Sequence, residues 1–168
     1  ADALVTPGGE RESHWDESAR AVLQALILHV LTTEPPEYQT LPRLRQWLMA
    51  GDFLGRMAKN KEFYGVISGE AEALLALGDE ERGSILSTAR RNTKFLESPA
   101  MQAVLTRSDF DLRDLKRERM TLYLCLPASR LHTHARWLRL VVGLALALME
   151  REPTRPERPV LFLMDEFA

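Results

Sequence analysis

The chain has 168 residues, of which 45% are apolar and 27% are charged, and its formal net charge is −2 at pH 7. This length and composition are typical of a globular protein with a proper hydrophobic core. A near-neutral charge argues against a protein that holds nucleic acid through a generally basic surface, so any such contact must be local. The one cysteine, Cys125, excludes an internal disulfide and fits a reducing compartment.

The ends of the chain and its most apolar stretch bear on its relation to a membrane. The first residues lack the charged start and apolar run of a signal peptide. Residues 138–149 are shorter than the ~20 residues of a membrane-spanning helix, and they include Arg139. The first residue is not Met, and no further element follows the last apolar run. We therefore expect a segment of a larger protein that does not itself cross a membrane.

The first part of the chain predicts helices and no strand. Residues 1–12 lack periodicity and are expected to form a linker. From Ser13 to Pro35, apolar residues recur at helical spacing and predict an amphipathic helix of about five turns. They are Trp15, Ala19, Val22, Leu23, Leu26, Ile27, Val30 and Leu31. Further helices are predicted over residues 40–51, 53–60, 70–77, 80–97 and 98–105. Together, residues 13–117 are expected to form an all-α domain.

The pattern changes after this helical part. Residues 120–126 and 160–164 are short apolar runs typical of buried strands. Between them, residues 130–150 predict a long and mostly apolar helix. Strand, helix and strand make a βαβ unit with parallel strands. The predicted fold class is therefore mainly α, with the all-α domain followed by a βαβ piece of a parallel-sheet domain over residues 118–168.

Two carboxylates, Asp165 and Glu166, directly follow the second predicted strand. Five apolar residues that lead into Asp-Glu are typical of the Walker B strand of a P-loop ATPase domain. Ligands of an open parallel sheet bind beyond the carboxyl ends of its strands, where Asp165 would hold Mg²⁺ beside nucleotide phosphates and Glu166 would polarise the attacking water. The alternative is a solvated acidic pair without a function. No G-x-x-x-x-G-K-[ST] loop occurs in the chain, so these residues are not expected to hydrolyse ATP alone.

Cations in two places are candidates for contact with nucleic acid or substrate. Arg90, Arg91 and Lys94 lie on one predicted helix, and Arg and Lys side chains suit phosphate contacts. Arg130 comes just after the first predicted strand, where a phosphate group or a neighbouring subunit could sit. The alternative for each place is a solvated polar helix surface.

Five segments form an ordered series along the chain. They are His14–Arg20, Glu81–Ala89, Ser108–Leu115, Leu122–Pro127 and Leu163–Phe167. Together they resemble the TraG-type coupling proteins of type IV secretion and conjugation, from about residue 13 to the end of the chain.

The resemblance implies a hexameric ATPase with a HerA/FtsK-like motor fold, anchored in the bacterial inner membrane. The present segment would lie on its cytoplasmic side. By this resemblance Asp165 and Glu166 are the Walker B pair, and the complete protein binds Mg-ATP while the isolated segment does not. Walker A and the membrane anchor lie outside these residues.

The resemblance also implies a role for residues 13–117. They would be the all-α domain inserted between Walker A and Walker B, which recruits a relaxase–DNA complex or effector proteins to the secretion channel. The expected partners are relaxase or effector proteins, single-stranded DNA and other type IV secretion components. The competing interpretation is a helical module that binds effector or chaperone proteins and never touches DNA. The net charge favours that module, whereas the cations at 90–94 favour DNA.

Overall fold

The computed structural model describes residues 1–5 and 13–164. The chain folds as two compact units, Ala1–Arg107 and a second unit that begins at Ser108. The boundary expected from the sequence, between residues 117 and 118, falls inside the second unit. Leu4 and Val5, in the part expected to be a linker, are buried in the first unit.

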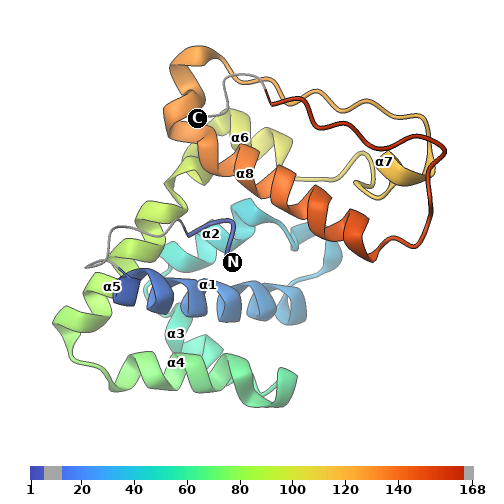
Figure 1. The fold of residues 1–168 in the computed structure, drawn as a ribbon. Coiled ribbons are helices and arrows are strands. Elements are labelled where there is room, and N and C mark those ends of the chain that lie inside the picture. The colour runs from blue at the N-terminus through green and yellow to red at the C-terminus, as the bar shows by residue number, and fades with distance from the viewer. Residues whose placement is uncertain (6–12, 165–168) are drawn as a thin grey trace. The chain divides into compact units, whose positions relative to one another are not determined.

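The first unit is built from helices (Figure 1). They are α1 (Ser13–Thr33), α2 (Leu41–Met49), α3 (Phe53–Met57), α4 (Val66–Ala76), α5 (Asp79–Asn92) and α6 (Pro99–Val104), with the short 3-10 turns η1 (Pro36–Tyr38), η2 (Phe63–Gly65) and η3 (Lys94–Glu97). The predicted helical character of this part of the chain is confirmed.

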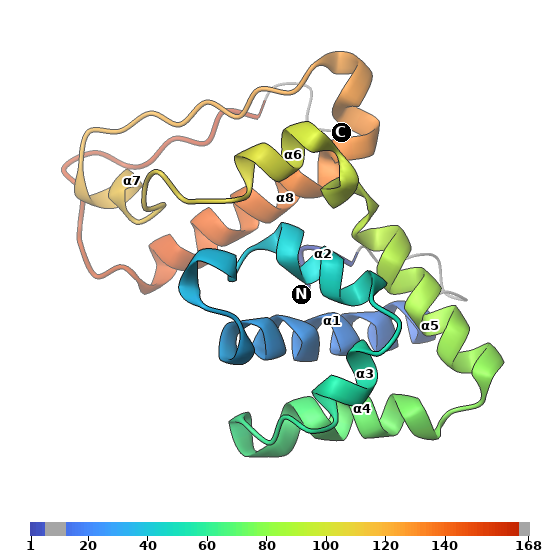
Figure 2. The same ribbon diagram turned by 180° about the vertical axis from the view of Figure 1, so that it is seen from behind.

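α1 is the centre of the first unit because apolar side chains cover more than one of its faces. It contacts α2, α4 and α5, and Figures 1 and 2 show it between its neighbours. A helix that is apolar on several sides is stable only when other elements surround it. Its buried apolar residues are Ala19, Val22, Leu23, Ala25, Leu26 and Val30. Leu31, which the periodicity also placed on the apolar face, is exposed.

Helix ends in this unit follow local signals in some places and tertiary contacts in others. Thr40 caps α2 as its residue type suggests, since its hydroxyl accepts a hydrogen bond from the Arg43 N–H at 3.2 Å. α5 ends at Asn92, whereas the sequence predicted a helix to residue 97. At that point the buried Thr93 accepts a hydrogen bond from the guanidinium of Arg45 at 2.8 Å, and the chain continues as η3.

The second unit contains α7 (Asp114–Arg117), α8 (Ala128–Arg151) and two irregular segments. α8 confirms the long helix predicted over residues 130–150. The two predicted strands are wrong, because the described part of the chain contains no strand and residues 120–126 and 160–164 form no ladder. The two segments run in the same direction (Figure 1). The side chains of Tyr123, Leu161 and Leu163 stay exposed. Parallel strands form where both faces of a sheet are covered, and here one face is open.

A charged cluster in the second unit holds α7 against the C-terminal end of α8. Lys116 donates hydrogen bonds to the carbonyl oxygens of Met149 (2.9 Å) and Glu152 (2.5 Å), groups that the helix itself leaves unpaired. Arg117 pairs with the Glu152 carboxylate, which also accepts from the N–H and hydroxyl of Thr154. These hydrogen bonds, first from Thr154 and then from Arg117, lower the pKa of Glu152 to about 2. The cluster fixes the points at which the two irregular segments begin.

Candidate functional site

The structure separates the three cations that the sequence placed together at residues 90–94. Arg90 points inward, and its Nε and Nη2 lie 3.4 and 3.5 Å from the carbonyl oxygen of Leu48, at the C-terminal end of α2. A cation at that position satisfies the end of a helix. Arg91 and Lys94 are exposed. Of the three cations, Arg91 and Lys94 lie on the surface of the first unit, whereas Arg90 contributes to its fold.

The residues expected to serve a nucleotide are only partly described. Arg130 is exposed in the first turn of α8. Asp165 and Glu166 lie outside the described residues. Among residues 1–5 and 13–164, no group of three or more His, Cys, Asp or Glu side chains could hold a metal ion.

Among the described residues of the first unit, the turn between α3 and α4 has an unusual backbone. Phe63 and Tyr64 have φ values of 52° and 57°, and Gly65 follows with φ 80°. Left-handed backbone is costly for bulky side chains and usually belongs to Gly or Asn. Neither ring is buried in return, since Phe63 is 47% exposed and Tyr64 is fully exposed. Packing of these rings therefore does not offset the backbone strain. Strained residues of this kind cluster at binding and active sites.

The side-chain amide of Asn60, which is partly buried, holds this turn in place. Asn60 donates hydrogen bonds to the Thr32 hydroxyl (2.8 Å) and to Nδ1 of His29 (3.0 Å), both near the C-terminal end of α1. Its side-chain oxygen accepts from the N–H of Glu62 at 3.0 Å. His29 is buried, and burial lowers its pKa, so the neutral ring serves as the acceptor. α1 thus anchors the strained turn through side-chain hydrogen bonds.

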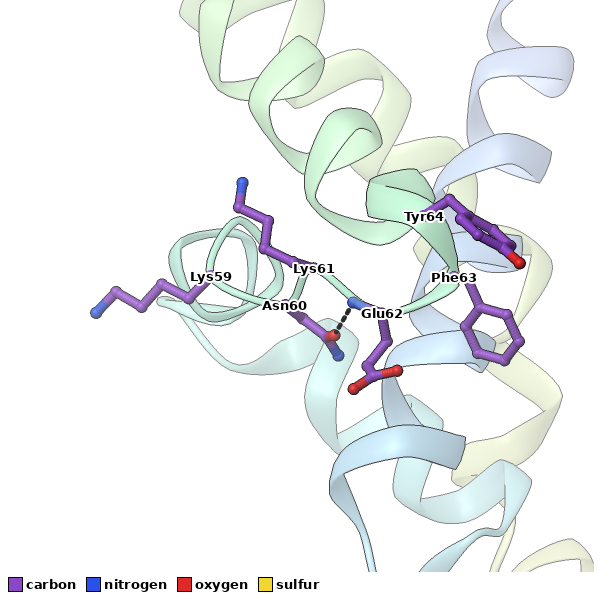
Figure 3. A pocket seen from close by; sticks show the side chains of 6 residues that line it. All are labelled: Lys59, Asn60, Lys61, Glu62, Phe63 and Tyr64. Carbon is purple, nitrogen blue, oxygen red and sulfur yellow. Dashed lines mark hydrogen bonds between the residues drawn. The ribbon is translucent and has the colours of Figure 1, made fainter.

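The turn projects its side chains in two directions (Figure 3). The rings of Phe63 and Tyr64 lie on one side, and the amino groups of Lys59 and Lys61 lie on the other. An open hollow of about 690 Å³ lies against residues 59–64. Sequence reasoning missed this site, because positive φ falls on Phe and Tyr and not on a residue type that marks such turns. Its one signal was Gly65.

The chain beyond the turn is acidic. From Glu62 to Glu81 it carries six carboxylates and no Lys or Arg. They are Glu62, Glu70, Glu72, Asp79, Glu80 and Glu81. The segment includes all of α4 and the first turn of α5. Glu72 and Asp79 pair with Lys61 and Arg82, which flank the segment. The other carboxylates disfavour contact with phosphate groups.

Comparison with known proteins identifies the family of this chain. The model of the family described as "Type IV secretory system Conjugative DNA transfer" matches residues 1–168. The chain belongs to this family. The membership confirms the resemblance inferred from the five ordered segments, and it makes the chain part of a type IV secretion coupling protein.

The relatives of this coupling protein cover it to different extents. "Conjugal transfer protein TraG" of Escherichia coli is 28% identical over 189 aligned residues, which include 99% of this chain and 30% of the relative. "Protein VirD4" of Agrobacterium fabrum is 39% identical over 71 residues, or 41% of this chain and 11% of the relative. The chain thus spans less than a third of the length of these relatives. No solved structure matches it. In the described residues no helix is long and apolar enough to span a bilayer.

Proposed function

We propose that this chain works within an ATP-driven coupling protein and that its first unit receives the substrate for type IV secretion. The observation that carries the proposal is a closed helical unit, with its own core around α1, in a chain that matches a conjugative DNA transfer family throughout. This unit contains no motif for nucleotide chemistry. It does contain a strained turn whose aromatic side chains are left exposed, as a recognition surface requires.

The charges of the first unit favour a protein as the directly bound component. Arg90 is engaged with α2, so Arg91 and Lys94 alone remain of the predicted phosphate-binding cluster on the surface. The segment from residue 62 to residue 81 carries carboxylates and no Lys or Arg, which disfavours contact with DNA phosphates. In this proposal the first unit binds a relaxase or an effector protein, and DNA follows as part of a relaxase–DNA complex.

The second unit belongs to the motor part of the complete protein in this proposal. Its two irregular segments both lead toward the N-terminal end of α8, where Arg130 lies (Figure 1). The carboxylate of Asp165 suits Mg²⁺, and Glu166 suits the polarisation of water. Mg-ATP supplies the phosphoryl chemistry when bound. The loop that cradles its phosphates is not among these residues, so it has to come from elsewhere in a homo-hexamer anchored in the inner membrane.

A binding measurement with the 168-residue chain tests the first unit's role. The chain is immobilised, and the purified relaxase of the same transfer system is passed over it by surface plasmon resonance. We expect saturable binding without DNA present. If the relaxase and the system's effector proteins all fail to bind, the recruitment role is wrong.

The alternative of direct DNA contact is tested with labelled single-stranded DNA. Phosphate contacts would make binding fall steeply with added salt. Replacing Arg91 and Lys94 with Glu, while Arg90 is kept to preserve α2, should then abolish it. We expect little binding of DNA by the unmodified chain. Strong, salt-sensitive binding that this double variant removes would favour DNA as the primary ligand.

The motor part is tested in the complete protein by Glu166→Gln. This variant should bind ATP normally and fail to hydrolyse it, because the water loses its polarising carboxylate. Normal hydrolysis would remove Glu166 from the mechanism.

A further inference from the structure

The outward face of α4 and the turn before it form an apolar surface that nothing in the described part of the first unit covers. Phe63, Tyr64 and Val66 are exposed large apolar side chains within four consecutive positions. α4 packs on α1 and α3 through its opposite face, which carries Ile67, Ala71 and Leu74. Figures 1 and 2 show α4 at an edge of the helical unit. An exposed apolar surface of this kind marks a place of interaction.

The spacing along α4 shows which kind of element fits this surface. Val66, Gly69, Ala73 and Ala76 are exposed and recur at alternating intervals of three and four residues. This is the seam along which one helix packs against another. Gly69 costs helix stability, and a side chain built at that position would meet no atom within 4 Å. Its lack of a side chain serves no packing in this chain, but it lets a partner helix approach closely.

The carboxylates beside the seam show the charge of that partner. Glu70 directly follows the seam position Gly69, and Glu72 directly precedes the seam position Ala73. On a helix, these two carboxylates therefore flank the seam on opposite sides. Side chains at such flanking positions select the partner by pairing with its charges. Glu72 forms an exposed ion pair with Lys61, which is weak and exchangeable. No described residue pairs with Glu70, and burial raises its pKa. A cation on the partner would stabilise the charged form of Glu70, which burial disfavours.

From these observations we infer that α4 and the Phe63–Tyr64 turn bind an amphipathic helix of the secreted protein, with Lys or Arg along its edges. The inference rests on the proposed function and names the class of segment that the first unit recognises. Apolar residues of that helix lie on the seam, and the rings of Phe63 and Tyr64 cover one end of it. Its cations face Glu70 and Glu72. A nucleic acid does not fit, because the same carboxylates repel phosphates.

The test uses a synthetic helical peptide of about three heptads made of Leu, Ala and Lys, with Lys along both edges of its apolar face. It is added to the ¹⁵N-labelled 168-residue chain, and backbone amide shifts are followed by NMR. We expect saturable shifts at Val66, Gly69, Ala73 and Ala76. The same peptide with Glu in place of Lys should not bind. Shifts confined to other helices, equal binding of the Glu peptide, or a dimer of the chain that buries α4 would overturn the inference.

A matched pair of variants completes the test. Ala73→Lys places bulk and a like charge on the seam and should weaken binding of the Lys peptide at least tenfold. Ala103→Lys makes the same change at an exposed alanine of α6 and should leave binding unchanged. Both variants must keep the wild-type circular dichroism spectrum and melting temperature. If the relaxase binds the chain and Ala73→Lys does not affect either ligand, the α4 surface is wrong while the recruitment role stands. If no secreted protein binds at all, both the α4 surface and the recruitment role are wrong.

Discussion

Arg45 of α2 donates a hydrogen bond from Nη1 to the hydroxyl of Thr93 at 2.8 Å, although 48 positions separate the two residues in the sequence. The same guanidinium donates to the carbonyl oxygen of Arg90 at 2.9 Å and to the carboxylate of Glu97. It therefore joins α2 to the junction of α5 and η3. Arg45 is buried, so water cannot take the place of these hydrogen-bond partners. The junction therefore depends on the contacts of this guanidinium.

Replacing Arg45 with Leu should destabilise the chain by about 2–4 kcal/mol, because the buried hydroxyl of Thr93 and the carbonyl oxygen of Arg90 lose their donor. Urea unfolding measures the change. The pKa of Glu97, which the hydrogen bond from Arg45 lowers, should rise toward its ordinary value. Arg56→Ala removes an exposed ion pair with Asp52 and a cation–π contact with the Trp47 ring, and it should cost less than Arg45→Leu. Equal costs for the two variants would show that the Arg45 contacts are not important to the fold.

Replacing Tyr64 with Gly should stabilise the first unit by about 0.5–1 kcal/mol. Gly adopts φ near 57° without strain, and the fully exposed ring contributes no packing. Tyr38→Gly is the control, because Tyr38 is also exposed but lies in η1 with ordinary backbone, and this variant should lose stability. Differential scanning calorimetry separates the two. A loss of stability in Tyr64→Gly would mean that the turn is not strained.

Replacing Glu70 with Gln should raise stability at pH 7. Burial raises the pKa of Glu70, so its charged form is disfavoured in the folded state and its contribution to stability falls as pH rises through that pKa. Below about pH 4 the wild-type carboxyl is protonated in both states, and the two proteins should melt alike. Glu37→Gln alters an exposed carboxylate and serves as the control. If Glu70→Gln is stabilised by the same amount at low pH, the charge of Glu70 is not the cause of the difference in stability.

Replacing Glu152 with Gln should loosen the link between α7 and the end of α8. The pKa of Glu152 is lowered to about 2, so its contribution to stability is present above the ordinary value of 4.5 and disappears as pH falls toward 2. Hydrogen–deuterium exchange of the last turn of α8 should therefore quicken at pH 7 in the variant. Near pH 2 variant and wild type should exchange alike. Unchanged exchange at pH 7 would show that Arg117 and Thr154 do not hold this end through Glu152.

The helices of the first unit could be predicted because their apolar residues recur with the helical period and their ends carry local signals such as Thr40. Contacts that depend on the tertiary fold were beyond such reasoning. The end of α5 is set by the buried pair of Arg45 and Thr93. α4 begins at Val66, earlier than the predicted residue 70, because a left-handed turn precedes it. Phe63 and Tyr64 are not residue types that predict such a turn. Spacing in the sequence also grouped Arg90 with Arg91, although Arg90 contacts the end of α2 and Arg91 lies on the surface.

The two strands were predicted from apolar runs, and these runs are real, yet the described chain forms no sheet. A strand depends on neighbours more than a helix does, because its hydrogen bonds go to another segment. Tyr123, Leu161 and Leu163 are 80%, 84% and 86% exposed, so the second layer that would bury a parallel sheet is missing around them. A sequence pattern reports that a segment suits a buried strand but not whether its partners are present.

Substrate choice by a chimera tests whether the first unit selects the secreted substrate. In the complete coupling protein that contains this chain, residues 13–107 are exchanged for the corresponding segment of the Escherichia coli TraG relative. ATP hydrolysis is measured alongside, so that loss of the motor is recognised. Transfer of the two cognate substrates is then compared in mating assays. We predict that substrate preference follows the exchanged helical unit while hydrolysis is retained. A chimera that hydrolyses ATP and still prefers the original substrate would show that the first unit does not select the substrate.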